Sequence, residues 1–179
     1  MKKPHLVRVG YGFAVAALAL ALSIPVGSAT AEPYSGSGQE IPKIPVLPFN
    51  DNATWQPAIY KAMSNWNATY SPVYLSVSSS GGSTITATSY SDSWHGYYQA
   101  CGSSCLYMRL NSRTIAADAS NVSNFITSVL VHEYGHALNL AHTSSTSIMN
   151  SSRNRNTMTT PSSSDVTNVR GWYPTWPNV

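Results

Sequence analysis

The run His-Glu-Tyr-Gly-His-Ala-Leu-Asn-Leu-Ala-His at residues 132–142 constrains this chain more than any other feature. On a helix, His132 and His136 project from one face, because residues four apart lie one turn above each other. Two imidazoles in that arrangement can hold one zinc ion at about 2.0–2.1 Å each. Glu133 is next to the first histidine and can reach a water on the metal without binding the metal itself. This is the layout of metal-assisted hydrolysis.

A zinc site with two helical histidines needs a third protein ligand. The chain contains no glutamate after Glu133, and its only later acidic side chain is Asp165, so His142 is predicted as the third ligand. In an unbroken helix His142 would lie about 9 Å from His136 along the axis, so the helix must end between them. Asn139 lies where the break is needed. Asparagine is the commonest non-glycine residue in the left-handed conformation that ends helices.

The pattern resembles the long motif H-E-x-x-H-x-x-G-x-x-H of the metzincin clan of metalloproteases, and within it the matrixin-like bacterial proteases. Asn139 stands where that motif has glycine, and Ser147-Ile148-Met149-Asn150 fits the clan's methionine turn beneath the metal. The resemblance implies an α/β (α+β) zincin domain, in which a twisted mixed sheet of four to five strands packs on two long helices, with a short C-terminal helix. It also implies an endopeptidase with one catalytic Zn²⁺ ion, in which Glu133 is the general base toward a zinc-activated water.

The first 31 residues are typical of a secretory signal peptide. Lys2, Lys3 and Arg8 form a basic start, residues 13–26 are almost wholly apolar, and Ala29-Thr30-Ala31 is a small-x-small cleavage site. No later segment is long and apolar enough to span a bilayer. We therefore expect a secreted, extracellular protein without a membrane contact after signal cleavage.

The charge balance of the remaining chain excludes several functions. Of ten Lys and Arg residues, three leave with the signal, whereas all seven Asp and Glu residues stay. The mature chain is thus formally neutral, and no nucleic-acid surface is expected. So few scattered acids also argue against a calcium site. The mature length of about 148 residues suits one domain, and we expect a monomer that acts on a protein or peptide substrate.

Residues 32–50 are rich in Pro, Gly and Ser, and a short pro-segment, a linker and an edge strand are all compatible with them. Prolines at 42, 45 and 48 argue against a central strand. Residues 51–179 are assigned to the catalytic domain.

Hydrophobic periodicity predicts the elements of that domain. Helices are expected over 54–67 and 123–138, with a third one capped by Ser163 or Ser164, and a loop containing Asp118 before the second. Strands are expected over 73–77, 84–90, 96–100 and 106–110. We infer that the last two form a hairpin, with a disulfide between Cys101 and Cys105 at its tip.

Two alternatives stay open. His95 could join a second, structural zinc, but its only nearby candidate partner is Asp92, so an ordinary surface or turn histidine is favoured. The chain could also be a non-catalytic secreted zinc-binding or adhesion module, or a hydrolase restricted to cell-wall peptides. Glu133 favours an enzyme, because a structural zinc clip gains nothing from a base.

Overall fold

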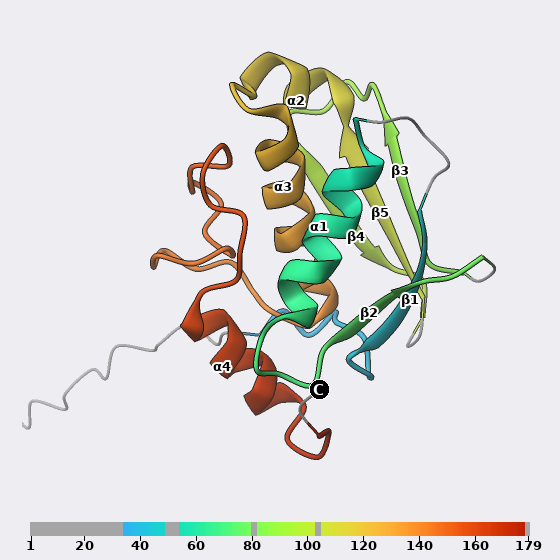
Figure 1. Ribbon diagram of the computed structural model, residues 1–179, viewed down its shortest axis with the longest axis vertical. Helices are drawn as coiled ribbons and strands as arrows, with labels where there is room; N and C mark the ends of the chain where they lie inside the picture. The colour runs from blue at the N-terminus through green and yellow to red at the C-terminus, as the bar shows by residue number, and fades with distance from the viewer. Residues whose placement is uncertain (1–33, 49–53, 80–81, 103–104, 178–179) are drawn as a thin grey trace, which may run out of the picture. The chain divides into compact units, whose positions relative to one another are not determined.

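The computed structural model describes residues 34–48, 54–79, 82–102 and 105–177, all within the unit Ala31–Val179, and the predicted signal peptide lies outside them. Five strands form a mixed sheet in the order β2-β1-β3-β5-β4 (Figure 1). They are β1 (Lys43–Pro48), β2 (Tyr74–Val77), β3 (Thr84–Thr88), β4 (Gly96–Ala100) and β5 (Leu106–Asn111). All neighbours are parallel except β4, which pairs antiparallel with β5 and leaves its other edge unpaired within this sheet.

Helices α1 (Gln56–Asn67) and α3 (Val122–Ala137) pack against each other and cover one face of the sheet (Figure 1). The predicted mixed α/β class is therefore confirmed. Helix α4 (Ser163–Trp172) follows a long irregular stretch after α3. Its cap is Ser162, not Ser163 or Ser164 as expected, because Asp165 reaches back to the backbone N–H of Ser162 in a capping box.

Helix α2 (Ser112–Asp118) occupies the stretch predicted as a loop. It buries only Thr114 and Ile115, so the sequence carries no amphipathic period to reveal it. Distant contacts hold it in place: Arg113 donates to three backbone carbonyls of residues 90–92, and the Thr114 hydroxyl donates to the carbonyl of Trp94.

Strand β1 lies inside the sheet, so the expectation that its prolines exclude a central position was wrong. The pairing is staggered: β1 meets β2 over residues 43–46 and meets β3 only at Leu47 and Pro48. The carbonyls of Pro42 and Val46 accept hydrogen bonds from the N–H groups of Tyr74 in β2 and of Ser78 directly after it. Since hydrogen-bonding groups alternate in direction along a strand, Pro45 turns its N–H-less nitrogen toward β3. That side is unpaired until Leu47, so no ladder bond is lost.

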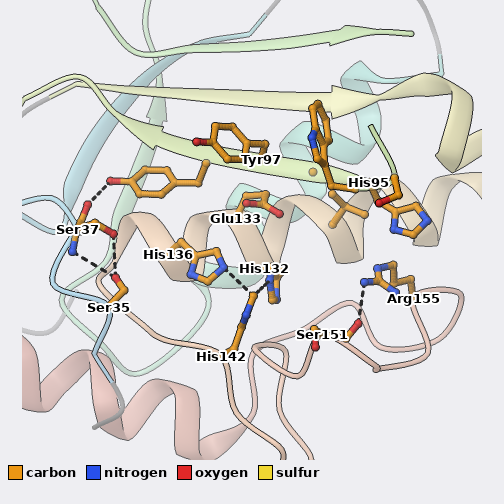
Figure 2. Close-up of a pocket in the computed structure, with 15 residues that line it drawn as sticks. Ser35, Ser37, His95, Tyr97, His132, Glu133, His136, His142, Ser151 and Arg155 are labelled. Atoms are coloured by element: carbon orange, nitrogen blue, oxygen red, sulfur yellow. Dashed lines mark hydrogen bonds between the residues drawn. The ribbon is translucent and has the colours of Figure 1, made fainter. Parts of the chain in front are cut away.

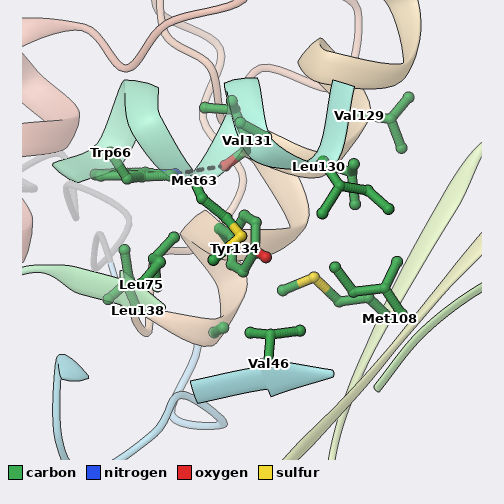
Figure 3. Packing of buried hydrophobic residues seen from close by; sticks show 14 of the residues in the cluster. Val46, Met63, Trp66, Leu75, Met108, Val129, Leu130, Val131, Tyr134 and Leu138 are labelled. Atoms are coloured by element: carbon green, nitrogen blue, oxygen red, sulfur yellow. Dashed lines mark hydrogen bonds between the residues drawn. The ribbon is translucent and has the colours of Figure 1, made fainter. Parts of the chain in front are cut away.

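The core lies between α1, α3 and the inner face of the sheet (Figure 3). Trp66 of α1 is fully buried and donates its indole N–H to the carbonyl of Val131 in α3 at 2.9 Å, which joins the two helices. Ile85, Met108 and Leu110 form part of the sheet's buried side.

The predicted hairpin and its disulfide are confirmed. Strands β4 and β5 pair from Gly96 with Leu110 to Ala100 with Leu106, and the disulfide joins Cys101 to Cys105 with their Cα atoms 5.2 Å apart. Among the described residues, no helix has both the length and the apolar character needed to cross a membrane.

Ile85 offers a test of this core, because it is fully buried and its neighbour Thr86 is exposed on the same strand. Ile85→Ala should lower the free energy of unfolding by about 2–5 kcal/mol, since a cavity would form between β3 and the helices. Thr86→Ala should change it by less than about 1 kcal/mol. Urea denaturation of the two variants measures the difference, and equal losses would contradict this placement of the core.

Candidate metal centre

Helix α3 carries the first two histidines and is buried along most of its length. The Asn121 side chain caps it by accepting a hydrogen bond from Asn124 N–H at 3.0 Å. At the other end Asn139 adopts φ 69°, the left-handed conformation that reverses the chain. Leu140 N–H then donates to the Gly135 carbonyl and Asn139 N–H to the His136 carbonyl, both at 2.9 Å. These two bonds form a Schellman motif.

The reversal brings three imidazoles together (Figure 2). The Nε2 atom of His142 lies 3.1 Å from Nε2 of His132 and 3.1 Å from Nε2 of His136. Ligands at about 2.05 Å from a tetrahedral zinc ion lie about 3.3 Å apart, so the three nitrogens fit one zinc ion. Among the described residues this is the one group of His, Cys, Asp or Glu side chains that could hold a metal ion.

Backbone carbonyls fix the protonation of two of these rings. Nδ1 of His132 lies 2.7 Å from the Ile148 carbonyl, and Nδ1 of His136 lies 2.9 Å from the Leu140 carbonyl. A carbonyl can only accept, so Nδ1 of His136 carries the proton and its Nε2 presents its lone pair to the metal position. Nδ1 of His132 also lies 3.0 Å from the Arg153 guanidinium, which can only donate, but the shorter contact with the Ile148 carbonyl favours the same tautomer for this ring. Burial further lowers the pKa of both histidines, that of His136 to about 4, so both rings are neutral at pH 7.

Glu133 is buried between α3 and β4, with 5% of its surface exposed. Burial raises the pKa of its carboxyl group to about 7, while a hydrogen bond from the backbone N–H of Tyr98 opposes that shift. Gly96 makes this close approach possible, because a Cβ there would collide with Val129 and with the Glu133 carboxylate. The carboxyl group is thus held where it can both take and release a proton near neutral pH.

Met149 packs beneath the histidine helix. Its side chain contacts α3 at Gly135, where a Cβ atom would collide with the Met149 sulfur. Asp165 of α4 holds the turn: it accepts hydrogen bonds from the Ser147 hydroxyl at 2.5 Å and from Ile148 N–H at 3.1 Å. The same Ile148 supplies the carbonyl that orients His132, so α4 supports the metal site through this turn.

Arg153 is a buried cation behind the site that the sequence did not reveal. Its guanidinium donates to the hydroxyl and carbonyl oxygens of Ser128 and to the carbonyl of Asn150. Its Nη1 atom lies 3.0 Å from Nδ1 of His132, so its charge opposes protonation of that ring. Arg153 therefore ties the methionine turn to α3, and its charge adds to the effect of burial in lowering the pKa of His132.

The site lies in a cleft of about 710 Å³ (Figure 2). Its walls come from the N-terminal segment, the stretch that leads into β4, helix α3 and the loop after Met149. The lining residues are Ser35, Ser37, Ser93, Trp94, His95, Gly96, Tyr97, Tyr98, Val129, His132, Glu133, His136, His142, Ser151 and Arg155.

The structure brings together the three predicted ligands, Glu133, Asn139 and Met149, and places the disulfide at the tip of the hairpin. His95 is half-buried in the cleft wall, where Nε2 lies 2.7 Å from a carboxylate oxygen of Asp118 and not beside Asp92. Gly96 and Gly135 were not predicted from the sequence as part of the site. Gly135 had a usable signal, because a glycine inside a helix costs about 1 kcal/mol and marks a close contact.

The family model described as Matrixin, a peptidase family, matches residues 48–174. No curated protein sequence matches the chain. Among solved structures, one titled "GM1 bound form of the ECX AB5 holotoxin" superposes with a TM-score of 0.56 at 18% sequence identity. The match covers 73% of this chain and 80% of that chain. At this identity the likeness concerns the fold alone.

The buried titratable groups predict how the metal-free protein responds to pH. His132 and His136 stay neutral when folded but take up protons in the unfolded chain below about pH 6.5. Glu133 acts in the opposite sense, because its carboxyl group keeps its proton up to about pH 7 in the folded protein but loses it at a lower pH in the unfolded chain. Between about pH 6.5 and 5 these three groups together make the unfolded chain bind about one more proton, and His142, whose pKa burial also lowers, acts in the same direction. The free energy of unfolding should fall by about 1.4 kcal/mol for each pH unit lost.

Urea denaturation with a chelator, at pH values from 5 to 7, measures this slope. Glu133→Gln should roughly double it, because the opposing proton is removed and both histidines still charge on unfolding. A slope that is unchanged in Glu133→Gln would contradict the raised pKa of Glu133.

Proposed function

The chain belongs to the matrixin family of metallopeptidases, and we propose that it is a secreted zinc-dependent endopeptidase with Glu133 as its general base. The observation that carries this proposal is the convergence of three Nε2 atoms, from His132, His136 and His142, in a cleft that Glu133 also lines. A metal ion held there would face the cleft, where a peptide has room to bind.

Zinc, when bound, supplies a Lewis acid that polarises the peptide carbonyl and lowers the pKa of water. The protein supplies the proton transfers. Glu133 accepts a proton from the attacking water and then delivers it to the leaving amine. The position of its carboxyl group suits both steps, because Glu133 follows the first ligand on α3 and lines the same cleft as the three histidines.

The edge strand β4 provides a place for the substrate backbone. Gly96, Tyr97 and Tyr98 of this strand line the cleft next to Glu133, and the strand pairs only with β5 on its other side. An extended peptide can pair with such an edge through backbone hydrogen bonds, which do not depend on its sequence. This supports an endopeptidase over a hydrolase for small molecules.

A non-catalytic zinc module is the rival interpretation. Structural zinc sites close all four positions with protein ligands, whereas the group formed by the described His, Cys, Asp and Glu side chains holds three histidines and no fourth member. A restricted target, such as a cell-wall peptide, would keep the same chemistry and differ only in the substrate.

Glu133→Gln separates enzyme from module. The variant should keep its zinc, because the three histidines are untouched, and should lose hydrolysis of casein by a factor on the order of 10²–10⁴. Zinc content by mass spectrometry and a fluorescent casein assay give both readouts. Glu40→Gln, at an exposed glutamate, is the matched control and should cleave at the wild-type rate. Chelator-insensitive cleavage, or a fully active Glu133→Gln, would refute the proposal.

We also propose that export removes residues 1–31 and that the strand-forming part of 32–50 stays in the enzyme. Strand β1 supports this, because it pairs with β2 and β3 inside the sheet and its loss would open the core. N-terminal sequencing of the secreted protein should begin at Glu32. A mature protein that began after Pro48 would overturn this expectation.

A further inference from the structure

One end of the cleft extends along α3 away from the metal position. Phe125, Val129 and Glu133 lie four residues apart on this helix and so share one face. Val129 lines the cleft one helical turn before Glu133, and Phe125 lies one turn before Val129. The guanidinium carbon of Arg155 lies 5.9 Å from the centre of the Phe125 ring. The cleft therefore continues past the catalytic carboxylate toward a guanidinium group (Figure 2).

Arg155 has hydrogen-bonding capacity that the protein does not use. Its Nη2 atom donates to the Ser151 carbonyl at 2.8 Å, which holds the side chain in the cleft wall. Its Nε atom is buried and has no partner among the described residues. A buried N–H without an acceptor is costly, so the protein does not satisfy the full hydrogen-bonding capacity of this guanidinium.

Arg153 lies two residues earlier in the same loop and provides a comparison, because its hydrogen bonds are all made within the protein. All three of its guanidinium nitrogens donate to oxygen atoms of Ser128 or Asn150, and the side chain is 7% exposed. Arg155 has one such bond and faces the cleft. Arg153 therefore has a structural role, whereas the guanidinium of Arg155 is available to bind a ligand.

No carboxylate of the described chain neutralises Arg155 by direct contact. The one ion pair in the described part of the protein joins His95 to Asp118, which attracts Arg155 only from a distance, as Glu133 does. Among the residues that line the cleft, Arg155 is the one arginine or lysine. This end of the cleft thus presents a partly desolvated positive charge.

We propose that Arg155 binds a carboxylate group of the peptide substrate, so that the enzyme selects peptides with a carboxylate close to the scissile bond. A guanidinium fork matches the two oxygens of a carboxylate, and a charge-assisted bond of this kind gains strength where water is excluded. Trp94 and Val129 on the cleft wall would contact the aliphatic part of the substrate's acidic side chain. This inference rests on the proposed peptidase function.

The carboxylate can come from an acidic side chain or from a free C-terminus, and matched peptides distinguish the two. One series of quenched fluorescent peptides carries Glu, Gln or Lys in turn at each of three positions on either side of the cleavage site. A second series ends in a free acid or an amide. The wild-type enzyme should show about a tenfold higher kcat/KM for the carboxylate at one position or at the terminus.

Variants of Arg155 assign the preference. Arg155→Gln should abolish it, Arg155→Lys should keep part of it, and Arg155→Glu should reverse it toward the Lys peptide. A merely structural role would not produce that reversal. Arg170→Gln is the control, because Arg170 is an exposed arginine of α4 over Tyr70, outside the cleft. If Arg155→Gln does not fold, Arg155→Lys and the peptide series with the wild-type enzyme still test the preference for a carboxylate.

Binding of the same peptides to zinc-loaded Glu133→Gln, measured by fluorescence anisotropy, gives a readout that needs no catalysis. If the carboxylate peptide binds Glu133→Gln more tightly than its neutral counterpart does, and the double variant Glu133→Gln/Arg155→Gln shows no such difference, the inference is supported. Equal cleavage and equal binding of the Glu, Gln and amide peptides would overturn it and leave the peptidase intact. Absence of cleavage of every peptide and of casein would instead refute the peptidase function.

Discussion

The reversal of the chain at Asn139 is the constraint on which the rest of the site depends. Without it, His142 would continue up the helix and lie about 9 Å beyond His136. A glycine would permit the same backbone, but the asparagine side chain adds a function: its Oδ1 atom accepts hydrogen bonds from Gly38 N–H at 3.0 Å and from the Ser35 hydroxyl at 3.2 Å. These bonds fasten the N-terminal segment to the turn, and Ser35 lines the cleft. One residue therefore shapes both the ligand set and a cleft wall.

The second constraint is the space around α3, which is enclosed by β4 on one side and by the methionine turn on the other. Both neighbours come so close that Gly96 and Gly135 have no room for a side chain. The tight fit buries most of Glu133, and this burial raises the pKa of its carboxyl group to about 7. The packing of the fold thus sets the acid–base range of the group proposed as the base.

The parts that the sequence predicted well are those governed by residues close together in the chain. The histidines lie within 132–142, and the hairpin and its disulfide lie within 96–111, so spacing and alternation are sufficient. Strand β1 and helix α2 depend on contacts with distant segments, and their local signals pointed elsewhere. The prolines of β1 are tolerated only because its two neighbours pair with different halves of the strand, which no local pattern records.

Arg153 and Arg155 show the same limit at the level of single side chains. In the sequence they are two arginines of one polar loop, with nothing to tell them apart. In the fold, Arg153 donates to oxygens of Ser128 and Asn150 and becomes part of the support for His132. Arg155 instead donates to the Ser151 carbonyl, lies over the Phe125 ring and faces the open cleft. What an arginine contributes is decided by how many acceptors the folded chain offers it. Where the chain offers too few, as at Arg155, a ligand in the cleft can supply the missing acceptors.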